Sequence, residues 1–164
     1  MMGVLASEND WSNLVDSSSD KIKIETKRSI RDLTMMRAEG PIDWSPRDVF
    51  RCLCYHPLRK EWDVNNEILE YKKKVGVNGY IAYIKTIRKF IISPRDFVCN
   101  YLINEEPDGT IVLCLSSENC DGGIGPISGI VRGNTALSGF VIKPLNGDPN
   151  KSMVQMMVEV DLKG

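Results

Sequence analysis

The stretch that decides the fold is residues 152–162, which reads SMVQMMVEVDL. Every second residue of it is apolar. These apolar residues are Val154, Met156, Val158, Val160 and Leu162. Successive side chains of a β-strand point to opposite faces, so this spacing predicts a strand with one wholly apolar face. Such a face has to be covered by other elements or by a bound molecule.

Similar short segments, separated by turn residues, occupy most of the chain upstream of this strand. We predict strands over residues 21–28, 33–37, 67–75, 80–90, 97–104, 110–116, 129–133 and 136–143. The breaks between them contain glycine, proline, asparagine and aspartate, and their spacing favours hairpins. Gly40 and Pro41 are expected to end the second strand. The sequence therefore predicts an α+β domain built on an antiparallel sheet.

One helix is predicted, beginning after Ser45. Serine is a favoured N-cap, and Pro46 suits the first helical position. An apolar stripe follows at Val49, Phe50, Leu53 and Cys54. His56 precedes a proline, and this disfavours helical backbone there, so we expect the helix to stop.

The composition is typical of one globular domain that lies outside membranes. Of its 164 residues, 42% are hydrophobic and 26% are charged, and the formal net charge is −1, which gives no general attraction to nucleic acid. No apolar run is long enough to span a bilayer, and residues 1–19 read as a polar tail rather than a secretory signal. We therefore expect a cytoplasmic protein whose folded domain covers residues 20–164.

Metal binding and catalysis have little support in the sequence. The five cysteines include no CxxC pair, and His56 is the single histidine. A His-rich metal site is excluded by that count, and a nucleophilic Ser–His or Cys–His system would rest on His56 alone. We predict no cofactor, no metal and no enzymatic activity.

Four segments, in order, resemble the START (steroidogenic acute regulatory protein-related lipid transfer) family. They are RKEWD at 59–63, SPRDFV at 93–98, GIVRG at 129–133, and the closing stretch from FVIKPL at 140–145 to DLKG at 161–164. The ending is similar to the cholesterol-handling branch. The resemblance implies a helix-grip fold, in which a curved antiparallel sheet and a long C-terminal helix enclose one lipid. That helix normally follows DLKG, so we expect this domain to be C-terminally incomplete.

The function implied by the resemblance is non-enzymatic binding and intracellular transfer of a sterol, phospholipid or ceramide-like lipid. A lipid-sensing or scaffold domain that binds without transferring is the alternative. In cholesterol-binding members an acidic residue lies thirteen positions before the motif arginine and an arginine lies six after it. Here these positions hold Ala82 and Tyr101, so both charges are gone together. The predicted pocket residues are Ala82, Cys99, Tyr101, Ile103, Met156, Val158 and Val160.

Two further groups of residues are expected to have structural or entrance roles. The charged and aromatic residues of the family motifs are interpreted mainly as structural. They are Trp62, Asp63, Arg95, Asp96 and Arg132. A glycine-rich loop is expected at the pocket entrance or as a plain connection, and it contains Asp121, Gly122, Gly123, Ile124 and Gly125.

Two lysine-rich stretches, residues 71–74 and 85–89, are either solvated strand faces or contacts to acidic lipid headgroups. The headgroup interpretation implies transient association with membranes. An apolar sheet face left without its helix predicts self-association.

Overall fold

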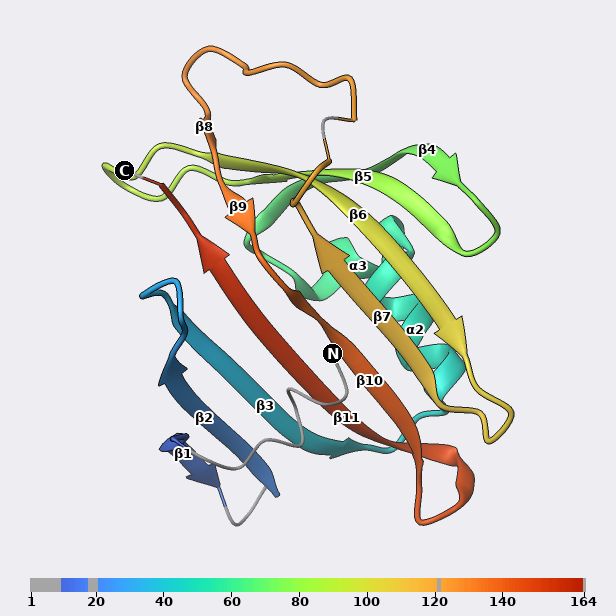
Figure 1. Ribbon diagram of the computed structural model, residues 1–164. Helices are drawn as coiled ribbons and strands as arrows, with labels where there is room; N and C mark the ends of the chain where they lie inside the picture. Colours follow the sequence, from blue (N-terminus) through green and yellow to red (C-terminus); the bar gives the residue numbers. More distant parts are fainter. Residues whose placement is uncertain (1–9, 18–20, 121, 164) are drawn as a thin grey trace.

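The computed structural model describes residues 10–17, 21–120 and 122–163. They form a curved 11-stranded sheet with two helices packed behind it (Figure 1). The path through the sheet is β1-β2-β3-β11-β10-β7-β6-β5-β4, with β8 beside β6 and β9 beside β11. Neighbouring strands are antiparallel except β6 and β8. The predicted α+β class and antiparallel sheet are confirmed.

The strands and helices have the following bounds. The strands are β1 (Ser12–Ser17), β2 (Ile22–Arg28), β3 (Thr34–Ile42), β4 (Asn66–Val75), β5 (Gly79–Thr86), β6 (Arg95–Glu105), β7 (Ile111–Ser116), β8 (Val131–Arg132), β9 (Asn134–Thr135), β10 (Ser138–Leu145) and β11 (Asp148–Asp161). The helices are α2 (Pro46–Cys54) and α3 (His56–Trp62). No helix follows β11 within the described part of the chain, which reaches Lys163.

The predicted helix start is confirmed, but a second helix was missed. The Ser45 hydroxyl accepts a hydrogen bond from the Asp48 backbone N–H at 3.2 Å and caps α2. α2 ends at Cys54, as the proline signal predicted. α3 then begins at once, because proline also fits the first turn of a helix.

Strand β3 runs through Gly40 and Pro41, so the predicted end there was wrong. The two residues pair with Val154 and Met153 of β11. On the other side of β3, pairing with β2 stops at Glu39. Pro41 therefore has a strand neighbour on one side only, and its missing N–H removes no hydrogen bond to β2.

Two further boundaries differ from the sequence prediction. β1 lies within residues 1–19, which were expected to be a polar tail, and it pairs with β2 at the edge of the sheet. β5 ends at Thr86 rather than Phe90, and residues 87–94 form a loop before β6.

One end of the sheet is crossed by the chain between β8 and β9. β8 pairs with the start of β6, and β9 pairs with the end of β11. Gly133 lies between them, directly over the ring of Phe97 on β6. A Cβ atom at Gly133 would be 2.3 Å from Phe97 Cε1, so the crossing depends on this close approach of backbone to ring.

Replacing Gly133 with alanine should lower the free energy of unfolding by about 2 kcal/mol, because the new methyl group overpacks the Phe97 ring. Gly125→Ala is the matched control, since no atom lies within 4 Å of the position its Cβ would take. Urea unfolding of both variants checks the prediction. Equal stabilities would show that the crossing is not tightly packed.

Candidate functional site

One face of the sheet, here called the inner face, carries Ala82, Cys99 and Tyr101. Ala82 of β5 is paired with Cys99 of β6, and Tyr101 lies two residues further along β6 on the same face. Each of the three is at most 2% exposed. They form one buried cluster with Leu69, Phe97 and Leu113. The inner face therefore holds the apolar core between β4, β5, β6 and β7.

The other four predicted pocket residues lie on the same face. Ile103 and Val160 pack against the buried cluster. Met156 is paired with Phe140, which also packs against the cluster, and Val158 follows on the same face of β11. All four are half-buried. The seven residues thus share a continuous surface across β5, β6 and β11, and their role in ligand binding stays a prediction.

Helix α2 covers only part of the inner face. Val49 and Leu53 of α2 pack against Ile111 of β7 and Ile142 of β10. A hollow of about 300 Å³ remains beside the helix. It is lined by Arg47, Phe50, Arg51, Ile103, Glu105 and Ile111. Ile103 therefore belongs both to the predicted pocket surface and to a hollow next to α2.

The hydroxyl of Tyr101 is the distinctive polar atom of the inner face. It is buried and has no hydrogen-bond partner among the described residues. Burial raises the pKa of Tyr101, so the side chain is a neutral phenol at physiological pH. An unpaired buried hydroxyl costs about 1–3 kcal/mol. It offers one donor and one acceptor to any molecule that reaches the inner face.

Tyr71 lies beside Tyr101 but is 41% exposed, and its hydroxyl has a partner. The two rings meet edge to face, with 5.8 Å between their centres. The Tyr71 hydroxyl donates a hydrogen bond to the Cys54 carbonyl oxygen at 2.9 Å. Burial raises the pKa of Tyr71 and also raises the pKa of the Cys54 thiol to about 11. These groups are uncharged, and only the Tyr101 hydroxyl among them is unpaired.

The charge nearest these groups, on Arg59, is balanced by Asp63. Arg59 Nε donates to Asp63 Oδ2 at 2.8 Å, and its Nη1 donates to the Leu53 carbonyl at 2.9 Å. Its guanidinium also lies 5.5 Å from the centre of the Trp62 ring. Burial raises the pKa of Asp63 while Arg59 lowers it, and the net direction is downward. Trp62 and Asp63 thus hold Arg59 in place.

Asp96 and Arg132 form a bidentate ion pair. Arg132 Nε and Nη2 donate to the two carboxylate oxygens of Asp96 at 2.7 and 3.0 Å, and Asp96 is 1% exposed. The same guanidinium donates to the carbonyls of Ile124 at 3.1 Å and Gly125 at 3.2 Å. Arg132 therefore fixes the glycine-rich loop to the start of β6.

The glycine-rich loop begins on the face opposite Tyr101. A Cβ atom at Gly122 would lie 2.6 Å from Val98 and 3.0 Å from Ile81, whose side chains point away from the inner face. Gly123 has a positive φ of 68°. Asp121 lies outside the described residues. The role of this loop as a pocket entrance stays a prediction.

Arg95 does not pair with its neighbour Asp96. Its guanidinium donates to three backbone carbonyls, those of Ser93 at 2.7 Å, Leu162 at 3.1 Å and Lys163 at 3.0 Å. Arg95 thus joins the start of β6 to the chain that leaves β11.

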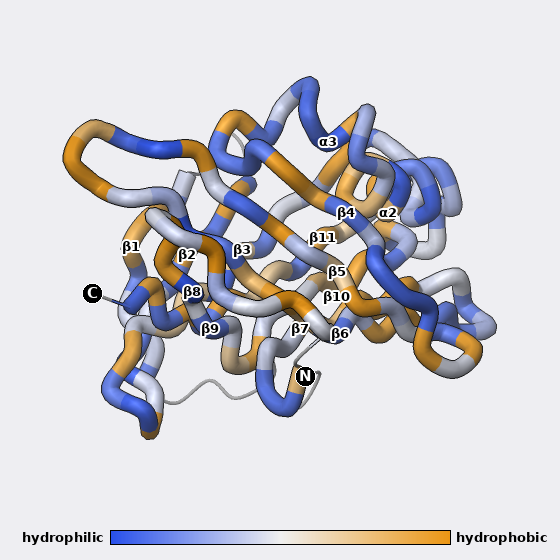
Figure 2. The backbone as a smooth tube through the Cα atoms, turned by 90° about the horizontal axis from the view of Figure 1, so that it is seen from above, coloured by the Kyte–Doolittle hydropathy of each residue, from blue (hydrophilic) through white to orange (hydrophobic). Residues whose placement is uncertain are grey.

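The most exposed apolar segment is the loop between β5 and β6. Phe90 is 99% exposed and Ile91 is 95% exposed. A tight turn between Lys89 and Ile92 places them at the tip, with Phe90 at a positive φ of 53°. Figure 2 shows this loop projecting from the body, with hydrophobic and hydrophilic stretches in succession. Sequence reasoning assigned residues 80–90 to one strand and missed this tip, although the bounding Ser93-Pro94 was a signal.

Among the described residues, no group of three or more His, Cys, Asp or Glu side chains is arranged to hold a metal ion. No helix in the described ranges is long and apolar enough to cross a membrane.

Replacing Tyr101 with phenylalanine should raise the free energy of unfolding by about 1 kcal/mol, because it removes a buried hydroxyl without a partner. Tyr71→Phe is the matched control and should lower it by about 1 kcal/mol, since it removes the hydrogen bond to Cys54. Urea unfolding measures both. A loss of stability in Tyr101→Phe as large as that in Tyr71→Phe would contradict the assignment.

Comparison with known proteins identifies the fold and the family. The family model described as START domain matches residues 1–164. StAR-related lipid transfer protein 5 of Mus musculus is 31% identical over 137 residues, covering 79% of this chain and 62% of that protein. Steroidogenic acute regulatory protein of Xenopus laevis is 25% identical over 169 residues, covering 99% of this chain and 57% of that protein. The chain thus spans less than two thirds of the length of these relatives.

Solved structures show the same fold. The structure of human StAR-related lipid transfer protein 5 superposes with a TM-score of 0.88 at 24% identity, covering 100% of this chain and 78% of the other. The structure of human STARD10 superposes with a TM-score of 0.84 at 16% identity, covering 99% of this chain and 65% of the other. The predicted helix-grip architecture is confirmed by these matches. The chain belongs to the START domain family.

Proposed function

We propose that this protein binds one lipid against the inner face and carries it between membranes through the cytoplasm, without chemical reaction. The observation that carries the proposal is the Tyr101 hydroxyl, which is buried and unpaired within an apolar surface. Relatives that share the family are named lipid transfer proteins. Burial of a lipid methylene contributes about 0.8 kcal/mol, so an apolar surface of this extent binds a lipid mainly through contact area.

The charges around the inner face favour a lipid whose buried end is uncharged. Ala82 and Tyr101 carry no charge, and the charge of Arg59 is balanced by Asp63. The described residues of the buried cluster are uncharged, so a phosphate or carboxylate buried among them would be an unpaired charge, which is costly. A single hydroxyl or carbonyl can instead bond to the Tyr101 hydroxyl. A sterol or a ceramide-like lipid meets this requirement better than a phospholipid does.

Contact with a membrane is assigned to the loop between β5 and β6. Its tip presents Phe90, Ile91 and Ile92, and Arg88 and Lys89 precede them. Apolar side chains of such a tip enter the headgroup region, while the cations meet acidic lipids. The C-terminal end of β11 lies beside this loop (Figure 1). This position supports membrane contact by the loop at the edge of the inner face.

Replacing Tyr101 with phenylalanine should weaken binding of dehydroergosterol, a fluorescent sterol with one hydroxyl, about fivefold to tenfold. This corresponds to one lost hydrogen bond of about 1 kcal/mol. Tyr55→Phe, at an exposed tyrosine, should leave the affinity unchanged. Fluorescence titration of purified protein measures both. If no sterol binds, and fluorescent phosphatidylcholine binds instead, the proposed lipid class is wrong.

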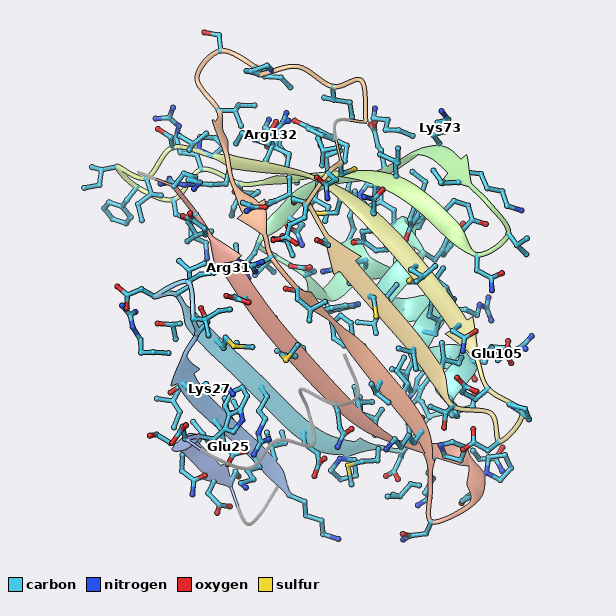
Figure 3. The ribbon with its side chains drawn as sticks, in the orientation of Figure 1. Glu25, Lys27, Arg31, Lys73, Glu105 and Arg132 are labelled. Carbon is cyan, nitrogen blue, oxygen red and sulfur yellow. The ribbon has the colours of Figure 1, made fainter. Side chains whose placement is uncertain are left out.

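Changing Phe90 and Ile91 together to aspartate should reduce transfer of dehydroergosterol between vesicles containing phosphatidylserine at least about tenfold. The reason is that two apolar side chains, each contributing about 1.5–3 kcal/mol when buried, no longer enter the membrane. The matched control changes Val75 and Val77 together to aspartate. Both are exposed in the hairpin that carries Lys73 (Figure 3). It should transfer lipid normally. Loss of transfer in the hairpin variant alone would place membrane contact at residues 71–77 instead.

A further inference from the structure

The loop between β5 and β6 is closed at its base by Thr86 and Arg95. The Arg95 backbone N–H donates to Thr86 Oγ1 at 2.9 Å, and that hydroxyl donates to the Arg95 carbonyl at 3.2 Å. The Arg95 side chain binds the Ser93 carbonyl from within the same loop. Arg95 is therefore fixed to the loop through both its backbone and its guanidinium.

The same guanidinium reaches the chain that leaves β11. It donates to the carbonyls of Leu162 and Lys163 at 3.1 and 3.0 Å. Two residues before Leu162, Val160 packs against the buried cluster that contains Tyr101. A short path of hydrogen bonds and intervening backbone thus connects the exposed tip at Phe90 with the inner face. It passes through Arg95 and the last residues of β11.

We propose that Arg95 is the positioning residue that transmits contact of loop 87–92 with a lipid surface to the end of β11 at the inner face. This inference rests on the proposed function, since it assumes that a lipid surface holds the loop. The coupling requires the three-carbonyl contact and not merely a positive charge. Arginine presents its donors in a fixed planar fork, whereas a lysine ammonium is a single point that cannot span the same three acceptors.

Hydrogen exchange followed by mass spectrometry tests the coupling in the presence and absence of phosphatidylcholine–phosphatidylserine vesicles. In the unchanged chain, vesicles should slow amide exchange in residues 87–92 and also in residues 160–163. In Arg95→Gln and Arg95→Lys they should slow exchange in residues 87–92 alone. Lys151→Gln is the charge-matched control, because Lys151 is exposed and pairs with Asp43 at the opposite end of β11. It should respond as the unchanged chain does.

A second comparison needs no vesicles. Loss of the charge-assisted hydrogen bonds should speed exchange in residues 160–163 roughly tenfold in both Arg95 variants. Exchange in β4 should stay unchanged, which shows that the fold is intact. Three results would overturn the coupling. Vesicles could slow exchange in the loop but not in residues 160–163, or Arg95→Lys could show the same exchange as the unchanged chain. The exchange rates measured without vesicles could also be unchanged in the Arg95 variants. Vesicles that fail to protect the loop, together with faster exchange in residues 160–163, would refute the proposed membrane contact and leave the Arg95 link standing.

Discussion

The structure depends on one constraint, the need to keep the apolar inner face of a curved sheet away from water. Strands β4 to β7 bury part of this face in a cluster around Ala82, Cys99 and Tyr101. Helix α2 covers the part of the face on β7 and β10 with Val49 and Leu53. Along β11, Met156 and Val158 remain half-buried. The surface available for a ligand is therefore continuous with the core, because the same strand face supplies both.

Ion pairs balance the buried charges on both faces of the sheet, and that of Asp96 lies on the face opposite Tyr101. Asp96 is satisfied by the fork of Arg132, and Arg59 is satisfied by Asp63. Removing one partner of such a pair leaves a buried or half-buried charge uncompensated, which is strongly destabilising. Both pairs also fix backbone, since Arg132 binds the glycine-rich loop and Arg59 binds the carbonyl of Leu53. The polar group left for a ligand at the cluster is then the uncharged hydroxyl of Tyr101.

Local patterns in the sequence predicted most of the sheet. Alternation in residues 152–162 identified β11, and the Ser45 cap with Pro46 identified the start of α2. The errors occurred where tertiary context decides. Gly40 and Pro41 read as a strand end, yet β11 supplies a partner there and β2 does not. Pro57 stopped one helix and started another, and β1 exists through its pairing with β2.

The candidate site was only partly predictable for the same reason. Period-2 spacing placed Cys99, Tyr101 and Ile103 on one face, and the structure agrees. No local pattern reveals that the Tyr101 hydroxyl lacks a partner while the Tyr71 hydroxyl has one, because each depends on residues distant in sequence. Nor could spacing show that Arg95 binds the carbonyls of Leu162 and Lys163.

The central claim is that an uncharged lipid binds at the inner face through the hydroxyl of Tyr101. Native mass spectrometry of the protein purified from cells tests it most directly, followed by identification of whatever lipid is released. The account predicts one lipid for each chain, with a hydroxyl or carbonyl as its single buried polar group. A chain that carries a phospholipid with a charged headgroup, or that stays empty when offered sterols and ceramides, would contradict it.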